Sequence, residues 1–304
     1  MWWRVRWMIA VGVVLVLGAL AIYTYTPGWR PPFAQEPFTS VNAPSQISQT
    51  PTTLTLAGSG SNLPLTRLLF RRFLRTHTSC VGCKVHRSIG SKGGIRAVND
   101  GAVGLGLISR ALRANERALG LQTFLYARVS VVFAAHPSVP LKALDRASLL
   151  SLYGGRTKRW SNGLPVVVFQ REKGDSGHRL LERGIPGFAR VNRAAYRRGL
   201  WRVMYRDQDM QEALMYTPGA IGVFDKGAIV SQSLPLRIFP LAKDVSAHLH
   251  KKNALYKPLS FVSRVQPSGR AKEFLDFTYS PEGQKLICRA GYIAISRDGE
   301  EGCR

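Results

Sequence analysis

Three loops rich in glycine and serine are the part of this sequence best suited to hold a ligand. They span residues 58–62, 90–94 and 174–178, and each precedes a segment with helical spacing. The free N–H groups and the partial positive charge at a helix start favour an anion. Glycine lets the backbone approach that anion closely, and serine side chains add hydrogen-bond donors. One such loop is more often only a helix cap, but three in one chain predict a cradle for a small anion.

Arg171 stands just before the third loop. Its planar guanidinium can hold an oxyanion through two parallel hydrogen bonds. A surface ion pair with a neighbour such as Glu172 is the alternative interpretation.

Residues that could catalyse a reaction are scarce. Ser176 and His178 are the closest pairing of a nucleophile with a base, but side chains this near at a helix start rarely face each other. No cluster of acidic residues has the spacing of a metal site. We therefore predict that the protein is not an enzyme and has no catalytic residue, metal or cofactor.

Short apolar runs alternate with helical patterns along the chain and would position the three loops. Strand-like runs occupy 54–57, 84–88, 129–134 and 166–169, and helical spacing appears at 65–73 and 95–99. Such alternation is typical of an α/β architecture with mostly parallel sheets. Ligands of these sheets bind beyond the carboxyl ends of the strands, which is where the three loops are expected.

The N-terminus indicates the compartment. Residues 1–6 include two arginines, and an uninterrupted apolar run follows from 7 to 23. This order directs the rest of the chain out of the cytoplasm, either as a cleaved signal or as a retained membrane helix. We assign residues 1–26 to this signal or anchor and the proline-rich residues 27–52 to a disordered linker. A periplasmic or cell-surface location follows, with the membrane as a partner if the helix is retained.

The four cysteines fit an oxidising compartment. An even count there predicts two disulfides, most simply Cys80–Cys83 and Cys288–Cys303. The competing interpretation is a metal site built from the first pair with His77 and His86, but zinc sites usually bring a second pair of closely spaced ligands. We therefore expect disulfides and no metal.

Charge is the outlying property of the composition. Lysine and arginine number 43 against 18 acidic residues, which gives a formal net charge of +25 and favours an anionic partner. An arginine-dense stretch at 190–206 also contains Tyr196 and Trp201, a mixture found in nucleic-acid-binding proteins. At helical pitch these arginines spread over about half of the helix circumference, so a solvated face is the better interpretation. We do not expect nucleic acid as a partner.

The sequence resembles the phosphate-binding proteins of bacterial ABC importers, a branch of the type II periplasmic binding-protein superfamily. The similar segments are the loop at 88–95, a strand ending in Ser-Arg-x-Leu at 103–112, the tryptophan segment at 152–160 and Pro-Gly-Ala-Ile-Gly at 218–222. Segments like the family's closing helices follow at 274–291. These matches keep the family's order and cover about residues 53 to 297.

The resemblance implies a two-lobed type II periplasmic-binding-protein fold. Residues 53–134 would form the first part of lobe 1, residues 135–232 lobe 2, and residues 233–304 the return to lobe 1. It implies an extracytoplasmic solute-binding protein that captures phosphate, or a similar tetrahedral oxyanion, in the cleft between the lobes for an ABC transporter permease. A surface-anchored binder of polyanions or nucleic acid, or an anion sensor with the same fold, is the alternative.

The resemblance and the loops together place the ligand-binding residues at Ser61, Asn62, Leu63, Ser91, Ser109, Arg110, Arg171, Asp175, Ser176, Gly177 and His178. The sequence departs from the family at Asn62, where Thr or Ser is common, and in the register of the third loop, which is open by one residue. Ser109 stands where some relatives have a carboxylate that accepts the proton of hydrogen phosphate. Asp175 would restore that acceptor if it points into the cleft, but as a helix cap it would turn away.

Overall fold

The computed structural model describes residues 53–78, 80–239 and 255–303. The predicted signal or anchor and the linker lie outside these residues. Among the described residues, no helix has the length and apolar character needed to span a bilayer.

Each lobe is built on three parallel strands. In lobe 1, β1 (Thr55–Gly58) lies between β2 (Lys84–Ser88) and β3 (Leu105–Ile108). In lobe 2, β5 (Val167–Arg171) lies between β6 (Arg202–Met204) and β7 (Ala220–Asp225). All of β3 and β7 is buried, as expected of strands that are covered on both faces.

One long strand, β4 (Gln122–Ala135), runs through both lobes. It pairs antiparallel with β9 (Tyr256–Ser263) of lobe 1 along its first part and with β7 of lobe 2 along its last five residues. The short strands β8 (Arg237–Phe239) and β10 (Ile293–Ala294) also pair antiparallel with β4. The prediction of mostly parallel sheets was therefore wrong outside the three parallel strands of each lobe, which lie at the two ends of the strand order. The lobe boundaries at 134/135 and 232/233 stay a prediction, since β4 passes from one lobe to the other without interruption.

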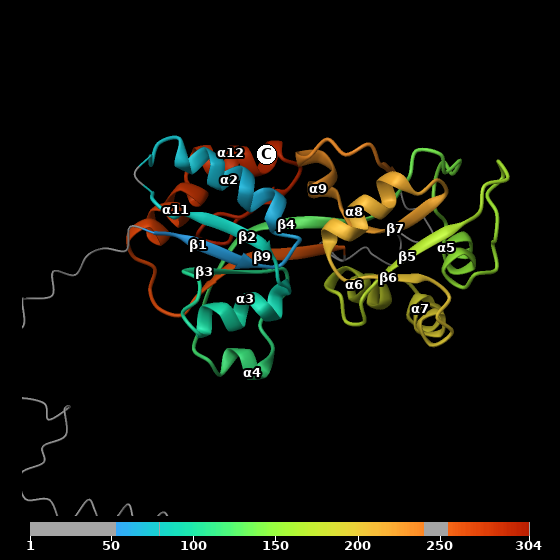
Figure 1. The fold of residues 1–304 in the computed structure, drawn as a ribbon, viewed down its shortest axis with the longest axis horizontal. Helices are drawn as coiled ribbons and strands as arrows, with labels where there is room; N and C mark the ends of the chain where they lie inside the picture. Colours follow the sequence, from blue (N-terminus) through green and yellow to red (C-terminus); the bar gives the residue numbers. More distant parts are fainter. Residues whose placement is uncertain (1–52, 79, 240–254, 304) are drawn as a thin grey trace, which may run out of the picture. The chain divides into compact units, whose positions relative to one another are not determined.

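Helices cover both faces of each lobe (Figure 1). In lobe 1, α2 (Leu63–Leu74), α11 (Gly269–Tyr279) and α12 (Pro281–Arg289) lie on one side of the strands, and α3 (Gly90–Asn99) and α4 (Ala114–Arg117) on the other. Lobe 2 has α8 (Asp207–Tyr216) and α9 (Lys226–Ser231) on one side, with α5 (Arg146–Tyr153), α6 (Ser176–Gly184) and α7 (Phe188–Arg197) opposite.

Each lobe has its own apolar core. In lobe 1, Tyr126 stacks on Phe261 with ring centroids 4.2 Å apart, and Phe274 meets Phe261 edge to face. In lobe 2, Tyr153 and Phe188 pack edge to face at 4.8 Å. Two separate cores joined by the shared strand β4 confirm the two-lobed α/β fold.

The second glycine-serine loop differs from its prediction. Residues 90–94 are the first turns of α3, and only Ile89 separates that helix from β2. A Cβ atom added at Gly94 would lie 2.8 Å from the Gly58 Cα, so this glycine lets α3 pack directly on β1. Its role is close packing of a helix on a sheet.

Both predicted disulfides are confirmed. Cys80 is bonded to Cys83, and Cys288 to Cys303. The first bond removes the cysteines from the alternative metal site, and His77 instead stacks on Phe73 with ring centroids 4.0 Å apart. In the described part of the chain no group of three side chains could hold a metal ion.

Candidate functional site

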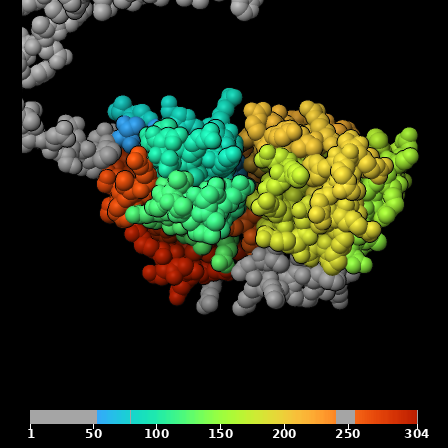
Figure 2. Space-filling view, turned by 90° about the horizontal axis from the view of Figure 1, so that it is seen from below, coloured from blue at the N-terminus to red at the C-terminus, as the bar shows by residue number. Residues whose placement is uncertain are grey.

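A cavity of about 420 Å³ lies between the lobes. Its walls come from residues that follow the carboxyl ends of β1, β2 and β3 in lobe 1 and of β5 and β6 in lobe 2. Figure 2 shows the two lobes meeting along a seam, with α3 of lobe 1 beside lobe 2. The cavity thus occupies the place where α/β sheets carry their ligands.

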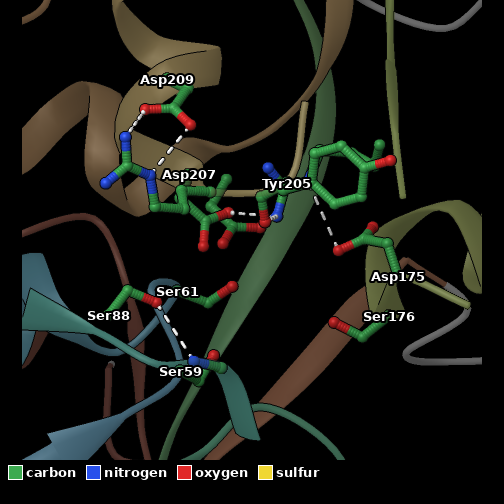
Figure 3. A network of polar contacts seen from close by, with 12 residues as sticks. Ser59, Ser61, Ser88, Asp175, Ser176, Tyr205, Asp207 and Asp209 are labelled. Carbon is green, nitrogen blue, oxygen red and sulfur yellow. Dashed lines mark hydrogen bonds and ion pairs between the residues drawn. The ribbon is translucent and has the colours of Figure 1, made fainter. Parts of the chain in front are cut away.

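Four serine hydroxyls converge in this cleft from both lobes. The Ser59 hydroxyl donates to Ser109 Oγ at 2.9 Å, and Ser109 Oγ lies 3.4 Å from Ser176 Oγ of the opposite lobe. The backbone N–H of Ser109 donates to Ser91 Oγ at 3.2 Å. In Figure 3, Ser59 and Ser61 lie on one side of the cleft and Ser176 on the other. Their donors can turn toward a guest, because hydroxyl hydrogens rotate freely.

Arg171 is the buried cation of the cleft. Its side chain ends β5 and only 5% of the residue is exposed. Nε lies 3.5 Å from Asp175 Oδ2, and Nη2 lies 3.4 Å from Asp207 Oδ1. Nη1 is buried without a hydrogen-bond partner among the described residues. Arg171 therefore does not form a surface ion pair with Glu172, and its Nη1 is left with an unused hydrogen-bond donor.

The charges around Arg171 keep it ionised. Burial alone would lower the pKa of Arg171, but Asp207 and Asp175 outweigh burial and raise it. Burial would conversely raise the pKa of Asp175, but Arg171 and Lys257 reverse this and lower it. The cleft therefore contains a permanent guanidinium between two carboxylates.

Asp175 both caps a helix and lines the cleft. Its Oδ1 accepts the N–H of His178 at 3.0 Å, which makes it the N-cap of α6. Its Oδ2 faces Arg171, and the residue lines the cavity. The sequence analysis treated capping a helix and facing the cleft as alternatives for Asp175, and in the structure Asp175 does both.

Asp207 is a cleft residue that sequence analysis missed. It is the first residue of α8 in lobe 2, and its carboxylate contacts Arg171 of the same lobe. Figure 3 shows Asp207 near Tyr205 in the polar network. A Cβ atom at Gly60 would lie only 2.0 Å from Asp207 Oδ2, so the carboxylate rests directly on the backbone of the first loop of lobe 1. An acidic residue at a helix start was the available signal. That signal usually marks a helix cap and does not show which cleft the residue faces.

A buried ion pair lies behind Ser61, a residue of the cavity wall. Lys257 of β9 contacts Asp225 at the end of β7 at 2.6 Å and donates to Ser61 Oγ at 2.7 Å. Burial would lower the pKa of Lys257, but the Asp225 carboxylate offsets this and raises it. Ser61 lines the cavity above this pair, as its prediction as a binding residue requires.

Five of the predicted residues lie elsewhere or have partners of their own. Asn62 is fully buried and donates to the Tyr126 hydroxyl at 3.1 Å. Arg110 lines the cavity, but both of its terminal nitrogens hold the Glu116 carboxylate at 2.6 and 2.7 Å. Leu63, Gly177 and His178 are buried and do not line this cavity. Ser61, Ser91, Ser109, Arg171, Asp175 and Ser176 are brought together.

The fold described above is shared with known proteins. Residues 43–282 match the model of a family described as the PBP superfamily domain. No curated protein matches the chain.

Solved structures with the same fold include a substrate-binding protein from Clostridium perfringens with bound phosphate. It has a TM-score of 0.63 and 20% identity, over 80% of this chain and all of that chain. An ABC-type phosphate transport receptor from Vibrio cholerae has a TM-score of 0.50 and 20% identity, over 79% of this chain and 98% of its own. At these identities the likeness shows the fold.

Proposed function

The chain belongs to the PBP superfamily, and on that premise we propose that it is an extracytoplasmic solute-binding protein that captures phosphate or a similar tetrahedral oxyanion between its lobes. The cleft would close on the ligand and present it to the permease of an ABC importer. Capture of a small solute between two lobes agrees with the strand β4, which runs through both lobes and leaves them joined at one side of the cleft.

The observation that carries the proposal is the convergence of donors from both lobes on one point. Ser59 and Ser109 of lobe 1 meet Ser176 of lobe 2, beside the buried and unpaired Nη1 of Arg171. A tetrahedral oxyanion accepts several hydrogen bonds from different directions, and a charged donor strengthens its binding. The start of α6 at Ser176 adds backbone N–H groups.

The carboxylates favour an oxyanion that still bears a proton. Asp207 faces the cleft, and among the described residues Arg171 is its polar contact, at 3.4 Å. A fully ionised ligand such as sulfate would place an oxygen without a proton against the Asp207 carboxylate, and neither group could donate a hydrogen bond. Hydrogen phosphate can donate one through its proton. The acceptor absent at Ser109 is thus supplied from the opposite lobe.

Titration calorimetry of the purified protein with phosphate, arsenate, molybdate and sulfate tests the proposal. We expect phosphate and arsenate to bind and sulfate to bind more weakly. Replacing Arg171 with Ala should weaken phosphate binding by about 2–4 kcal/mol, since it removes a charged donor and leaves two carboxylates without their cation.

Arg190→Ala is the matched control, because Arg190 is exposed on α7 and does not line the cleft. Circular dichroism of both variants would show that the fold is intact. Absence of heat with every oxyanion, or equal affinity of Arg171→Ala and Arg190→Ala, would contradict the proposal.

A further inference from the structure

A second cavity, of about 330 Å³, lies within lobe 2 between α6 and α7. It is separate from the interlobe cleft, although Glu172 and Gly174, at the start of the third loop, line both. His178, which the sequence analysis predicted to bind the ligand in the cleft, lines this second cavity instead.

Four cationic side chains surround this cavity: Lys173, Arg179, Arg193 and Arg197. In the part of the chain that the structure describes, none of them has a carboxylate oxygen within 4.0 Å. Two acidic residues, Glu172 and Glu182, also line it, so the walls carry two positive charges in excess. Unpaired cations on opposite walls attract an anion with more than one acidic group.

Polar groups without complete partners lie at the inner wall. His178 is 2% exposed, and its Nε2 has no hydrogen-bond partner among the described residues. Its Nδ1 lies 3.5 Å from the Tyr196 hydroxyl, which also lines the cavity. Burial lowers the pKa of His178 to about 4, so its imidazole is neutral at pH 7 and keeps one N–H donor. A buried polar atom without a partner calls for a ligand or water.

We infer that this cavity is a second anion site, which binds a compact polyanion with at least two phosphoryl or carboxyl groups through Arg179, Arg193 and Arg197. The site gives a role to part of the arginine-dense stretch at 190–206, which the sequence alone left as a solvated face. Because the third loop lines both cavities, a ligand here also contacts the loop that carries Asp175 and Ser176.

Calorimetry with diphosphate and with citrate tests the inference and distinguishes phosphoryl from carboxyl chemistry. The titrations use the full chain already saturated with phosphate, so that the interlobe cleft is occupied. We expect at least one probe to bind. The double variant Arg193→Glu/Arg197→Glu should weaken that binding by about 10- to 100-fold, since two charged donors become acceptors.

The matched control is Arg190→Glu/Arg198→Glu, which makes the same change of charge on exposed residues at α7 that do not line the cavity. It should leave the affinity for the probe within about twofold, which corresponds to a screened surface effect. The His178 ring resonances in NMR spectra should shift when the probe binds to the wild type. Equal losses in the two double variants would overturn the inference, as would absence of binding by both probes. The same titrations with the Arg171→Ala protein, whose cleft should bind phosphate only weakly, separate this inference from the proposed function, since binding in the second cavity does not require an occupied cleft.

Discussion

Arg171 is held between two carboxylates, and this arrangement sets how single residues of the cleft contribute. Asp175 is fixed by its role as the cap of α6, whereas Asp207 is held by Arg171 and by contact with Gly60. Unlike Asp175, Asp207 accepts no hydrogen bond from a helix N-terminus among the described residues, so its carboxylate is the one expected to accept a hydrogen bond from a protonated ligand. This distinction leads to a selectivity prediction.

Asp207→Asn should lower the preference for phosphate over sulfate. The amide can donate to a sulfate oxygen and no longer requires a protonated guest, so sulfate binding should strengthen while phosphate loses a charged acceptor. We expect the ratio of the two affinities to fall by about 10- to 100-fold, which is the range of one hydrogen bond to a charged group. Competition calorimetry with both anions measures this ratio.

Asp209→Asn is the control for that measurement. Asp209 lies two residues further along α8 and does not itself line the cavity, although its partner at 2.7 Å, the exposed Arg206, does. It should leave the ratio unchanged. If Asp207→Asn and Asp209→Asn have the same ratio as the wild type, Asp207 does not read the proton of the ligand.

The sequence predicted the cleft residues best where the hydrogen-bond donor lies close in sequence to the start of a helix. Ser91 and Ser176 lie in the first turns of α3 and α6, Arg171 ends β5 just before the third loop, and all three line the cleft. Ser59, Asp207 and Lys257 were missed. Asp207 contacts Gly60 and Lys257 donates to Ser61, and each of these two contacts joins segments more than 100 residues apart in the sequence. No local pattern contains that information.

At the scale of elements, the segment after β3 is anchored by one ion pair. Arg110 holds Glu116 through both terminal nitrogens, and the Arg113 backbone N–H donates to the same carboxylate at 2.8 Å. The hydrogen bonds from Arg110 lower the pKa of Glu116 from 4.5 to about 2, against the opposing effect of burial. The segment joins the cleft at Arg110 to the short helix α4.

The lowered pKa predicts how stability depends on pH. A carboxyl group whose pKa is depressed on folding stabilises the protein fully above its unfolded pKa, here 4.5, and loses that contribution as pH falls toward 2. Glu116→Gln should therefore reduce the free energy of unfolding at pH 7 and flatten its decline between about pH 4.5 and 2. Urea denaturation at a series of pH values measures both effects.

Glu300→Gln serves as the comparison, because Glu300 is exposed near the C-terminus. It should follow the wild-type pH profile. An unchanged slope for Glu116→Gln would mean that Arg110 does not hold the carboxylate in solution.

Element boundaries followed the sequence closely where apolar residues are periodic. The predicted strand at 84–88 and the helix around 65–73 correspond to β2 and α2. The prediction of a loop at residues 90–94 was wrong. Gly90 and Ser91 have a low intrinsic propensity for helix, whereas the packing of Gly94 against β1 favours a helix α3 that begins at Gly90. Tertiary contact there outweighs local preference.

At the scale of the whole described unit, the two lobes share one buried ion pair. Lys257 lies beside Val129 in the register of β9 on β4, and Asp225 lies beside Val131 in that of β7 on β4. The pair therefore spans β4 at the place where this strand changes its partner from lobe 1 to lobe 2. Ser61 of the first loop joins the same cluster through Lys257.

Removal of one member should be far more costly than removal of both. Lys257→Met leaves the Asp225 carboxylate buried without its cation, which we expect to lower the free energy of unfolding by about 3–5 kcal/mol. The double variant Lys257→Met/Asp225→Leu removes both charges and should recover most of that loss, since a buried pair replaced by apolar residues is often neutral. Lys272→Met breaks an exposed pair with Asp276 at 2.6 Å and should cost less than about 1 kcal/mol. Urea denaturation at pH 7 compares the three. If Lys257→Met lowers the free energy of unfolding no more than Lys272→Met does, the Lys257–Asp225 pair does not hold the lobes together at β4. The junction between the lobes must then depend on the strand pairing of β4 with β7 and β9 alone.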